Sequence, residues 1–332
     1  MQNLKKIAAS LCLLGSIAPA TSAVFVVAHP DDHMLMMGPN LISDISGGYP
    51  TVVVIMTAGD AANGVGDNAG FANNGYQYNG YGNQYYRVRL QANMIALDSI
   101  IPGGTPTGGR AWSQSTESFS TAIPAVEKWT LGNVTLYHLN LPDATNGLTS
   151  IPAGSTNSIR DITLTNRFTR ETLKETVRQI IARNNRNSPN VVLNYQRPLD
   201  PNDTVADHPH HMAVGEIVND AIAVPGYKCI WEARWHGYVQ GSASLRPVNM
   251  PHMLDPQRRM YELTQTILAQ RGNITPHGGN VPNPSWMQSI LVANPVAGGP
   301  QLQRGAMDAF HTNFYGKSYY DGRRQETANC AF

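Results

Sequence analysis

Short apolar runs alternate along the chain with segments that have the pattern of helices. Residues 24–28 and 51–57 are continuous runs of mostly β-branched and apolar residues, which predict strands buried on both faces. Between them, residues 39–46 begin with a proline and are followed by Gly47 and Gly48, a pattern typical of a short helix. A strand, a helix and a second strand in this order predict an α/β fold with a parallel sheet.

The same alternation continues through most of the chain. Further strands are predicted at residues 134–139, 190–195 and 227–238. Further helices are predicted at residues 85–98, 165–184, 213–223 and 256–270. Residues 60–83 are crowded with glycine, asparagine and tyrosine and are predicted to form a loop, either a flexible connection or a lid over a polar substrate. We therefore predict a Rossmann-like α/β domain at residues 24–245, with a mostly parallel sheet flanked by helices. A C-terminal extension at residues 246–332 is predicted to pack on or near it.

The first 23 residues have the layout of a secretory signal peptide. Lys5 and Lys6 precede an apolar stretch of 11 residues, and small residues lead up to Ala23. This stretch is shorter than the ~20 residues that a membrane-spanning helix needs, so no transmembrane segment is expected. We expect export to the periplasm or the extracellular space. Removal of residues 1–23 from the 332 would leave 309 and change the formal net charge from +1 to −1.

Composition narrows the possible partners and ligands. Only 14% of the residues are charged, and the near-zero net charge argues against a nucleic-acid partner. Cys12 would leave with the signal peptide, and the sequence leaves open whether Cys229 and Cys330 pair. Because no group of cysteines has zinc-ligand spacing, any metal must be held by histidines and carboxylates. The oligomeric state is also left open.

Two polar clusters stand at matching places in the predicted sheet. Residues 28–33 (Ala-His-Pro-Asp-Asp-His) follow the first strand, and residues 207–211 (Asp-His-Pro-His-His) precede a helix beyond the fourth strand. Ligands of open α/β sheets bind outside the carboxyl ends of the strands. Histidines and an aspartate from two such loops can converge on one zinc ion and leave a position for water. Since two histidines and one carboxylate also suit Fe²⁺, the sequence predicts a metal site without deciding the metal.

At these clusters the chain resembles the LmbE-like or PIG-L family of zinc-dependent de-N-acetylases. In that family a hydrophobic strand leads into Ala-His-Pro-Asp-Asp-Glu, and the next strand ends in a turn of Thr-x-Gly-Glu type. Here residues 28–33 and the turn Thr-Ala-Gly-Asp at 57–60 match this opening. Residues 208–211 (His-Pro-His-His) are similar to the family's second motif, His-Pro-Asp-His, and residues 141–143 to its Leu-Pro-Asp segment. The resemblance covers roughly residues 24–225.

The resemblance implies a role for five residues. It implies that His29, Asp32 and His211 ligate zinc, and that Asp31 is the general base that takes a proton from the metal-bound water. His208 would stabilise the oxyanion and protonate the leaving amine. An amide is a poor electrophile, and zinc can supply both an activated water and a polarised carbonyl.

Four other residues are candidates for substrate binding. Arg87 and Arg89 begin a predicted helix after the tyrosine-rich loop, where they would contact the substrate or, as the alternative, form surface ion pairs. Asp143 would border the pocket or cap a turn. His210 stands where the family has an aspartate.

Two positions depart from the family pattern. His33 replaces the glutamate after the aspartate pair, and His210 replaces the aspartate of the second motif. The lost carboxylates would have oriented metal ligands, so lower activity, a shifted pH optimum or a different substrate is possible. We expect both histidines to be solvated or hydrogen-bonded loop residues, and an extension of the metal site is the alternative.

These features together predict an exported zinc hydrolase that removes the acetyl group from an N-acetylated amino sugar or glycoconjugate. Two alternatives stay open. The first is a zinc amidase that acts on a non-sugar amide. The second is a carbohydrate-binding pseudoenzyme that kept the fold after losing turnover.

Overall fold

The structure is a computed structural model that describes most of the N-terminal two thirds of the chain and parts of the remainder. The described residues are 22–59, 85–104, 109–143, 147–184, 191–198, 207–223, 229–237, 248–249, 251–271, 291–292, 301–302, 317–318 and 320–326. Several predictions lie outside them: the signal peptide up to residue 21, the loop at 60–83, and Cys330, whose pairing with Cys229 therefore stays a prediction.

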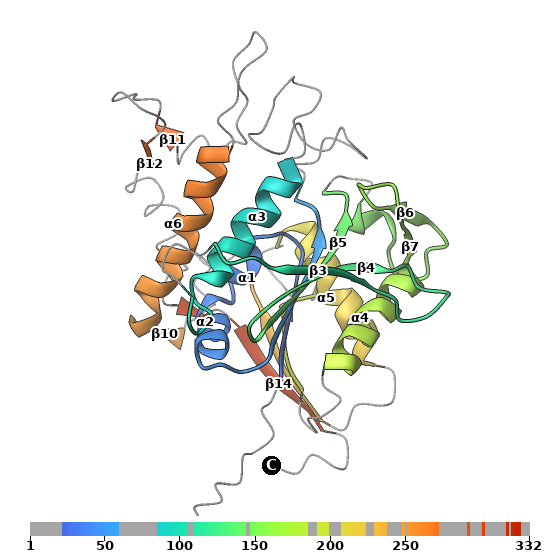
Figure 1. Ribbon diagram of the computed structural model, residues 1–332. Coiled ribbons are helices and arrows are strands. Elements are labelled where there is room, and N and C mark those ends of the chain that lie inside the picture. Colours follow the sequence, from blue (N-terminus) through green and yellow to red (C-terminus); the bar gives the residue numbers. More distant parts are fainter. Residues whose placement is uncertain are drawn as a thin grey trace, which may run out of the picture.

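A twisted eight-stranded sheet forms the centre of the molecule, in the order β14-β9-β8-β1-β2-β5-β4-β3 (Figure 1). The strands of this sheet are β1 (Ala23–Val27), β2 (Thr51–Thr57), β3 (Ser113–Glu117), β4 (Val126–Leu131), β5 (Val134–Leu141), β8 (Val191–Gln196), β9 (Cys229–Trp235) and β14 (Tyr320–Glu326). The five inner strands β9, β8, β1, β2 and β5 run parallel to one another. β14 on one edge and β4 and β3 on the other pair antiparallel. The predicted α/β class with a mostly parallel sheet is confirmed.

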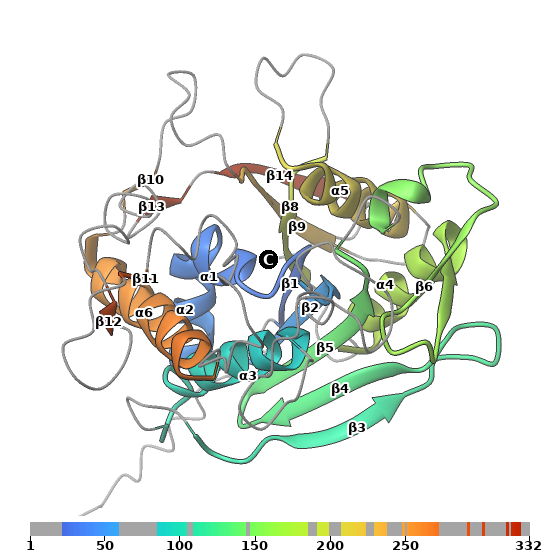
Figure 2. The same ribbon diagram turned by 90° about the horizontal axis from the view of Figure 1, so that it is seen from above.

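Helices cover both faces of this sheet (Figure 2). The helices on one face are α1 (Asp32–Leu35), α2 (Gly38–Ser46), α3 (Tyr85–Asp98) and α6 (Leu254–Arg271). The helices on the other face are α4 (Arg170–Asn184) and α5 (Pro209–Ile222). The remaining elements are short: η3 (Leu148–Ser150), β6 (Ser158–Arg160), β7 (Arg167–Thr169), β10 (Val248–Asn249), η4 (Pro251–Met253), β11 (Leu291–Val292), β12 (Gln301–Leu302) and β13 (Lys317–Ser318).

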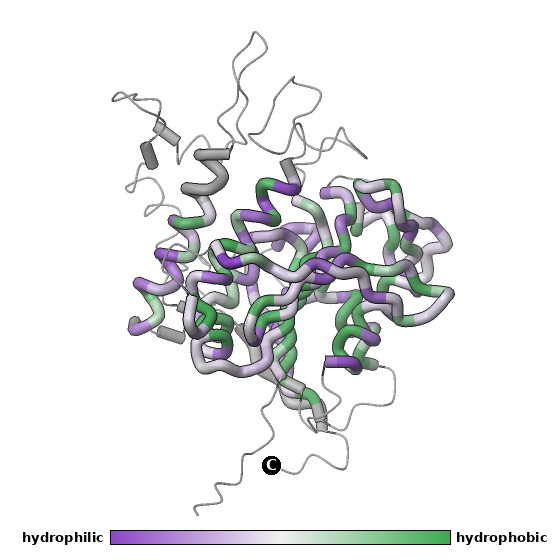
Figure 3. Tube along the Cα trace, viewed as in Figure 1, coloured by the Kyte–Doolittle hydropathy of each residue, from purple (hydrophilic) through white to green (hydrophobic). Residues whose placement is uncertain are grey.

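Alternate residues of the inner strands pack into two separate cores. Val24 and Val26 of β1 lie in the core under α4 and α5, whereas Phe25 and Val27 lie in the core under α1, α2, α3 and α6. All four side chains are fully buried, which is why this strand is apolar at every position (Figure 3). Because both faces of these strands are buried, a ligand can reach only the ends of the strands.

The edge strands were missed by the sequence predictions for a physical reason. β3 has the sequence Ser-Gln-Ser-Thr-Glu, and four of its five residues are exposed. An edge strand of this kind carries no apolar run or alternation that a sequence pattern can detect.

The predicted helix at 165–184 begins later than expected, at Arg170, because residues 167–169 pair with β6 instead.

Part of the C-terminal region packs directly on the α/β layers. Gln257 of α6 is fully buried and donates hydrogen bonds to the main-chain oxygens of Met34 (3.0 Å) and Leu35 (2.9 Å) in α1. β14, from the last residues described, adds the outermost strand next to β9. The division at residues 245 and 246 stays a prediction. In the part of the chain that the structure describes, no helix is long and apolar enough to cross a bilayer.

Glu117 of the edge strand β3 binds Arg183 of α4, and its ionisation makes the stability of the fold depend on pH. Tyr137 Oη (2.6 Å), Lys128 Nζ (2.8 Å) and an Arg183 guanidinium nitrogen donate to its carboxylate. Burial alone would raise the pKa of Glu117, but these donors outweigh it and lower the pKa from 4.5 to about 2. The stabilisation is therefore complete above pH 4.5 and is lost as the pH falls towards 2.

We expect Glu117→Gln to lower the free energy of unfolding at pH 7 by about 1–3 kcal/mol, because it weakens charge-assisted hydrogen bonds. Urea denaturation of wild type and variant should show this difference shrinking as the pH falls below 4.5. An equal difference at pH 7 and pH 3 would contradict the assignment.

Candidate metal centre

The polar clusters meet at the carboxyl edge of the sheet where the strand order reverses. From β1 the chain continues to β2 and β5 on one side, and β8 and β9 lie on the other side. The crevice outside the ends of β1 and β8 is the place where open α/β sheets bind ligands. His29 and Asp32 follow β1 directly, Gln196 is the last residue of β8, and α5 begins beside them at Pro209.

His29, Asp32 and His211 come together with the spacing of metal ligands. One donor atom from each lies within 4.8 Å of the other two, and all three residues are buried. His29 Nδ1 is 3.1 Å from Asp32 Oδ2, and His211 Nε2 is 3.3 Å from Asp32 Oδ1. The structure thus brings together the three residues that the family resemblance implies as ligands.

The side chains fit a metal ion chemically. Asp32 Oδ1 is buried and accepts no hydrogen bond from the described residues, although His211 Nε2 lies 3.3 Å away. Leaving such an oxygen without a donor is costly unless a cation completes its environment. Two imidazole nitrogens and one carboxylate oxygen are the ligands of a three-residue zinc or Fe²⁺ site with an open position. The donor set therefore fits the implied metal.

Further side chains hold the candidate ligands in place. His211 Nδ1 lies 3.0 Å from Asp207 Oδ1, and Asp207 in turn accepts the backbone N–H groups of His208 and Gly237, both at 2.7 Å. Gln196 Nε2 donates to Asp32 Oδ2 at 2.8 Å, while Gln196 Oε1 accepts the N–H of Ala28 at 2.8 Å. Such partners fix the orientation of metal ligands.

The electrostatics of the cluster favour positive charge between the carboxylates. Burial alone would lower the pKa of His29, but Asp32 and Asp143 outweigh it and raise the pKa well above 6.5. Burial is likewise outweighed at His211, where Asp32 and Asp207 raise the pKa to about 9. Burial would raise the pKa of Asp32, yet His211 and His29 hold it well below its usual value. The carboxylates that raise the pKa values of His29 and His211 would also stabilise a bound cation.

Asp31 lies next to the candidate ligands and is held by Arg89. Arg89 Nη2 donates to Asp31 Oδ1 at 2.8 Å, and Arg89 Nη1 donates to the carbonyl of Gly59 at 3.0 Å. Arg89 is buried, so this contact is shielded from solvent. Arg89, predicted to bind substrate, thus positions the predicted base in the described structure.

Gly59 leaves the space that Arg89 occupies. Its φ is +62°, and a Cβ added there would overlap Arg89 Nη1 and lie 2.7 Å from Pro30 Cδ. We expect Gly59→Ala to displace Arg89 and lower kcat by about tenfold without changing the metal content.

Gly103→Ala is the matched control for this prediction. Gly103 also has a positive φ (+75°), but nothing lies within 4 Å of an added Cβ. Both variants carry the same type of backbone strain, and Gly59→Ala alone disturbs Arg89. Equal kcat values in the two variants would refute the positioning role of Arg89.

His208 caps the N-terminus of α5. Its Nδ1 accepts the backbone N–H of His210 at 3.3 Å, which leaves Nε2 as the protonated nitrogen of the neutral ring. Burial and the neighbouring His29 and His211 lower the pKa of His208 to about 4. A neutral His208 is therefore a hydrogen-bond donor through Nε2 at neutral pH.

Two of the predicted substrate-binding residues, Asp143 and His210, contact the candidate metal ligand His29, whereas Arg87 pairs with a residue outside the candidate centre. Asp143 Oδ1 is 3.1 Å from His29 Nε2 and 3.0 Å from His210 Nδ1. Burial would raise the pKa of Asp143, but His29, His210 and Arg89 hold it well below its usual value. Arg87 instead pairs with Glu127 at 3.1 Å, which is the alternative that the sequence left open.

The two departing histidines lie in helices rather than in loops. His33 belongs to α1, is fully buried and lies with Nε2 2.9 Å from Asn93 Oδ1. Burial lowers its pKa to about 4. The expectation that His33 is a solvated loop residue is wrong, because α1 turns its side chain into the core. The expectation that His33 is hydrogen-bonded is confirmed. His210 is in the first turn of α5, buried, with Nδ1 3.3 Å from His29 Nε2.

Sequence reasoning gave no role to Gln196, Asn93 or Asp207. Gln196 and Asn93 carry no motif, and only the fold brings them beside Asp32 and His33. Asp207 had a usable signal, because it stands four residues before His211 at the start of a helix, where side chains at i and i+4 meet.

Comparisons with known proteins give similar solved structures but no match in sequence. No family model and no curated protein matches the chain. An N,N′-diacetylchitobiose deacetylase from Pyrococcus horikoshii is 12% identical over 92% of this chain and 84% of that one, with a TM-score of 0.45. The zinc-inhibited form of teicoplanin deacetylase Orf2 is 13% identical over 93% and 100%, also with a TM-score of 0.45.

The structural neighbours thus include two proteins described as deacetylases, both at low identity. They also include GalB, a 4-carboxy-2-hydroxymuconate hydratase from Pseudomonas putida, at 12% identity over 76% of this chain and 85% of that one, with a TM-score of 0.39. Similarities at this level do not identify the reaction that the protein catalyses. The reaction has to be inferred from the side chains of the site.

Proposed function

We propose that the protein is an exported, zinc-dependent hydrolase that removes the acetyl group from an N-acetylated amino sugar or glycoconjugate. The observation that carries the proposal is the buried set of His29, Asp32 and His211, with Asp31 and His208 beside it. Export rests on the signal-peptide pattern of residues 1–23.

The proposed reaction is the attack of water on an amide carbonyl. His29, Asp32 and His211 would hold zinc, which lowers the pKa of water to about 7 and polarises a carbonyl. Asp31, held by Arg89 at 2.8 Å, accepts the proton that the attacking water loses. His208 donates a hydrogen bond from Nε2 to the carbonyl oxygen as negative charge develops on it. The proton then passes to the amide nitrogen, the C–N bond breaks, and acetate and a free amine leave.

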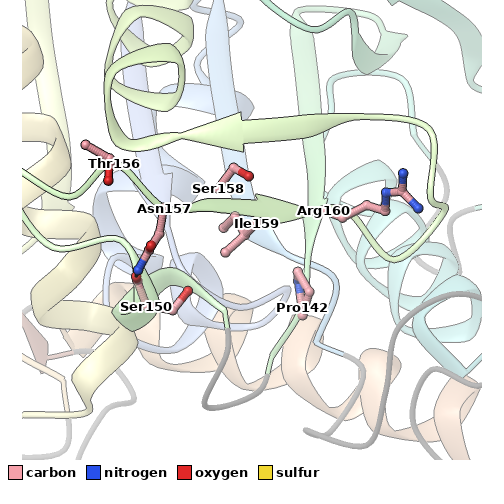
Figure 4. Close-up of a pocket in the computed structure, with 7 residues that line it drawn as sticks. All are labelled: Pro142, Ser150, Thr156, Asn157, Ser158, Ile159 and Arg160. Atoms are coloured by element: carbon pink, nitrogen blue, oxygen red, sulfur yellow. The ribbon is translucent and has the colours of Figure 1, made fainter.

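A polar pocket that Pro142 helps to line supports a sugar as the substrate. It has a volume of about 620 Å³ and is lined by Pro142, Ser150, Thr156, Asn157, Ser158, Ile159 and Arg160 (Figure 4). Pro142 directly precedes Asp143, so the pocket begins next to the candidate centre. Hydroxyl, amide and guanidinium groups are suited to hydrogen bonds with sugar hydroxyls.

We expect Asn157→Ala to raise the KM for an acetylated sugar about fivefold, which corresponds to the loss of one hydrogen bond of about 1 kcal/mol. The kcat should stay close to that of wild type, because Asn157 lies outside the donor set. Initial rates over a range of substrate concentrations check this. An unchanged KM would mean that Asn157 does not bind substrate.

The proposal is tested by measuring acetate release from N-acetylated sugars and from non-sugar amides, with and without a chelator. We expect release from acetylated amino sugars such as N-acetylglucosamine oligomers, and its loss on chelation. Release from non-sugar amides alone would favour the amidase. Sugar binding without acetate release by the zinc-loaded protein would favour the pseudoenzyme.

A further inference from the structure

The two ring nitrogens of His29 face two different sets of donor atoms. His29 Nδ1 is 3.1 Å from Asp32 Oδ2, on the side of the first candidate centre. His29 Nε2 is 3.1 Å from Asp143 Oδ1 and 3.3 Å from His210 Nδ1, on the other side of the ring. The first centre uses only one side of this imidazole.

The second set is as compact as the first. His210 Nδ1 and Asp143 Oδ1 are 3.0 Å apart, so three donor atoms lie 3.0–3.3 Å from one another. Ligands at 2.0–2.1 Å from a tetrahedral zinc ion would lie about 3.3 Å apart. His208 adds a fourth donor, because one ring nitrogen from each of His29, His208 and His210 lies within 4.8 Å of the others.

The second set also has the burial and chemistry of a cation site. His29 and His210 are buried, and the side chain of Asp143 is 16% exposed, which leaves an opening towards solvent. Imidazoles with one carboxylate bind Zn²⁺ and related divalent ions. His210 stands where the LmbE-like pattern has aspartate, so this set of ligands is a feature of this chain.

We propose that His29 Nε2, His210 Nδ1 and Asp143, with His208 in reach, form a second position for a divalent cation such as Zn²⁺. This proposal rests on the proposed function, because it takes His29 as a ligand of the first ion. With both positions filled, His29 would bridge two ions and release its ring N–H proton to solvent. The second ion therefore binds more weakly than the first. It also occupies Asp143 and His210, two of the side chains that the sequence predicts to bind substrate.

The test is the number of zinc ions per chain as free zinc is raised. Full-length protein is dialysed against increasing Zn²⁺ concentrations, and bound zinc is measured by mass spectrometry. Wild type should bind one ion at low zinc and a second at higher zinc. His210→Ala and Asp143→Asn should each bind one ion fewer than wild type at high zinc. His252→Ala is the matched control, because His252 is an exposed histidine on η4 outside both donor sets, and it should bind as wild type does.

Two results would overturn the second position. One is a single zinc ion per wild-type chain at every concentration. The other is an unchanged zinc count at high zinc in both His210→Ala and Asp143→Asn, with circular dichroism confirming that the variants are folded. A wild type that binds no zinc at all would instead refute the first centre and the proposed function with it.

Discussion

Replacing Asp31 with asparagine is expected to lower the rate of acetate release by a factor of about 10²–10⁴, the usual contribution of a general base. Asparagine has the same shape as aspartate but cannot take a proton from water. Its amide oxygen can still accept the hydrogen bond that Arg89 Nη2 donates at 2.8 Å. The geometry of the site should therefore survive while the proton acceptor is lost.

The zinc content is the control for this variant. Asp31 belongs to neither set of candidate metal ligands, so Asp31→Asn should retain as much zinc as wild type. Measurements of zinc and acetate release on the same samples separate the two effects. Acetate release that is unchanged in Asp31→Asn would remove Asp31 from the mechanism.

Replacing Asp32 with asparagine is expected to abolish zinc retention, and acetate release with it. Asp32 is fully buried and lies within 3.3 Å of nitrogens of both His29 and His211. A neutral amide is a poor ligand for zinc and no longer balances the charge of the ion. Asp44→Asn on α2 is the matched control, since it removes a partly exposed aspartate that belongs to neither donor set.

Zinc bound by the protein after dialysis measures this prediction directly. Wild type and Asp44→Asn should retain zinc, and Asp32→Asn should lose it. A full complement of zinc in Asp32→Asn would show that the ion is held elsewhere. Thermal denaturation of the zinc-free proteins checks that Asp32→Asn is folded.

The inner strands and the candidate ligands were predictable from sequence because burial on both faces and local motifs leave clear patterns. Residues 51–57 form β2 with the predicted bounds, and His29, Asp32 and His211 meet where the strand ends predict. The polar edge strand β3 leaves no such pattern, since most of its side chains face solvent.

The contacts around the ligands could not be predicted from sequence. Gln196 reaches Asp32 across 164 positions of the chain, so only the pairing of β8 with β1 brings them together. His210 was expected in a loop because the helix was predicted to begin at residue 213. In the structure α5 begins at Pro209, because His208 caps the helix and Pro209 suits its first position. That early start turns His210 towards His29.

The most direct test of a metal-dependent deacetylase is reconstitution of the chelated protein. Zinc is removed, then added back in steps, and acetate release from an N-acetylglucosamine oligomer is followed at each step. We predict no release from the zinc-free protein and a rise in proportion to zinc until one ion per chain is bound. Full release by the zinc-free protein, or none after one ion has bound, would contradict the proposed function.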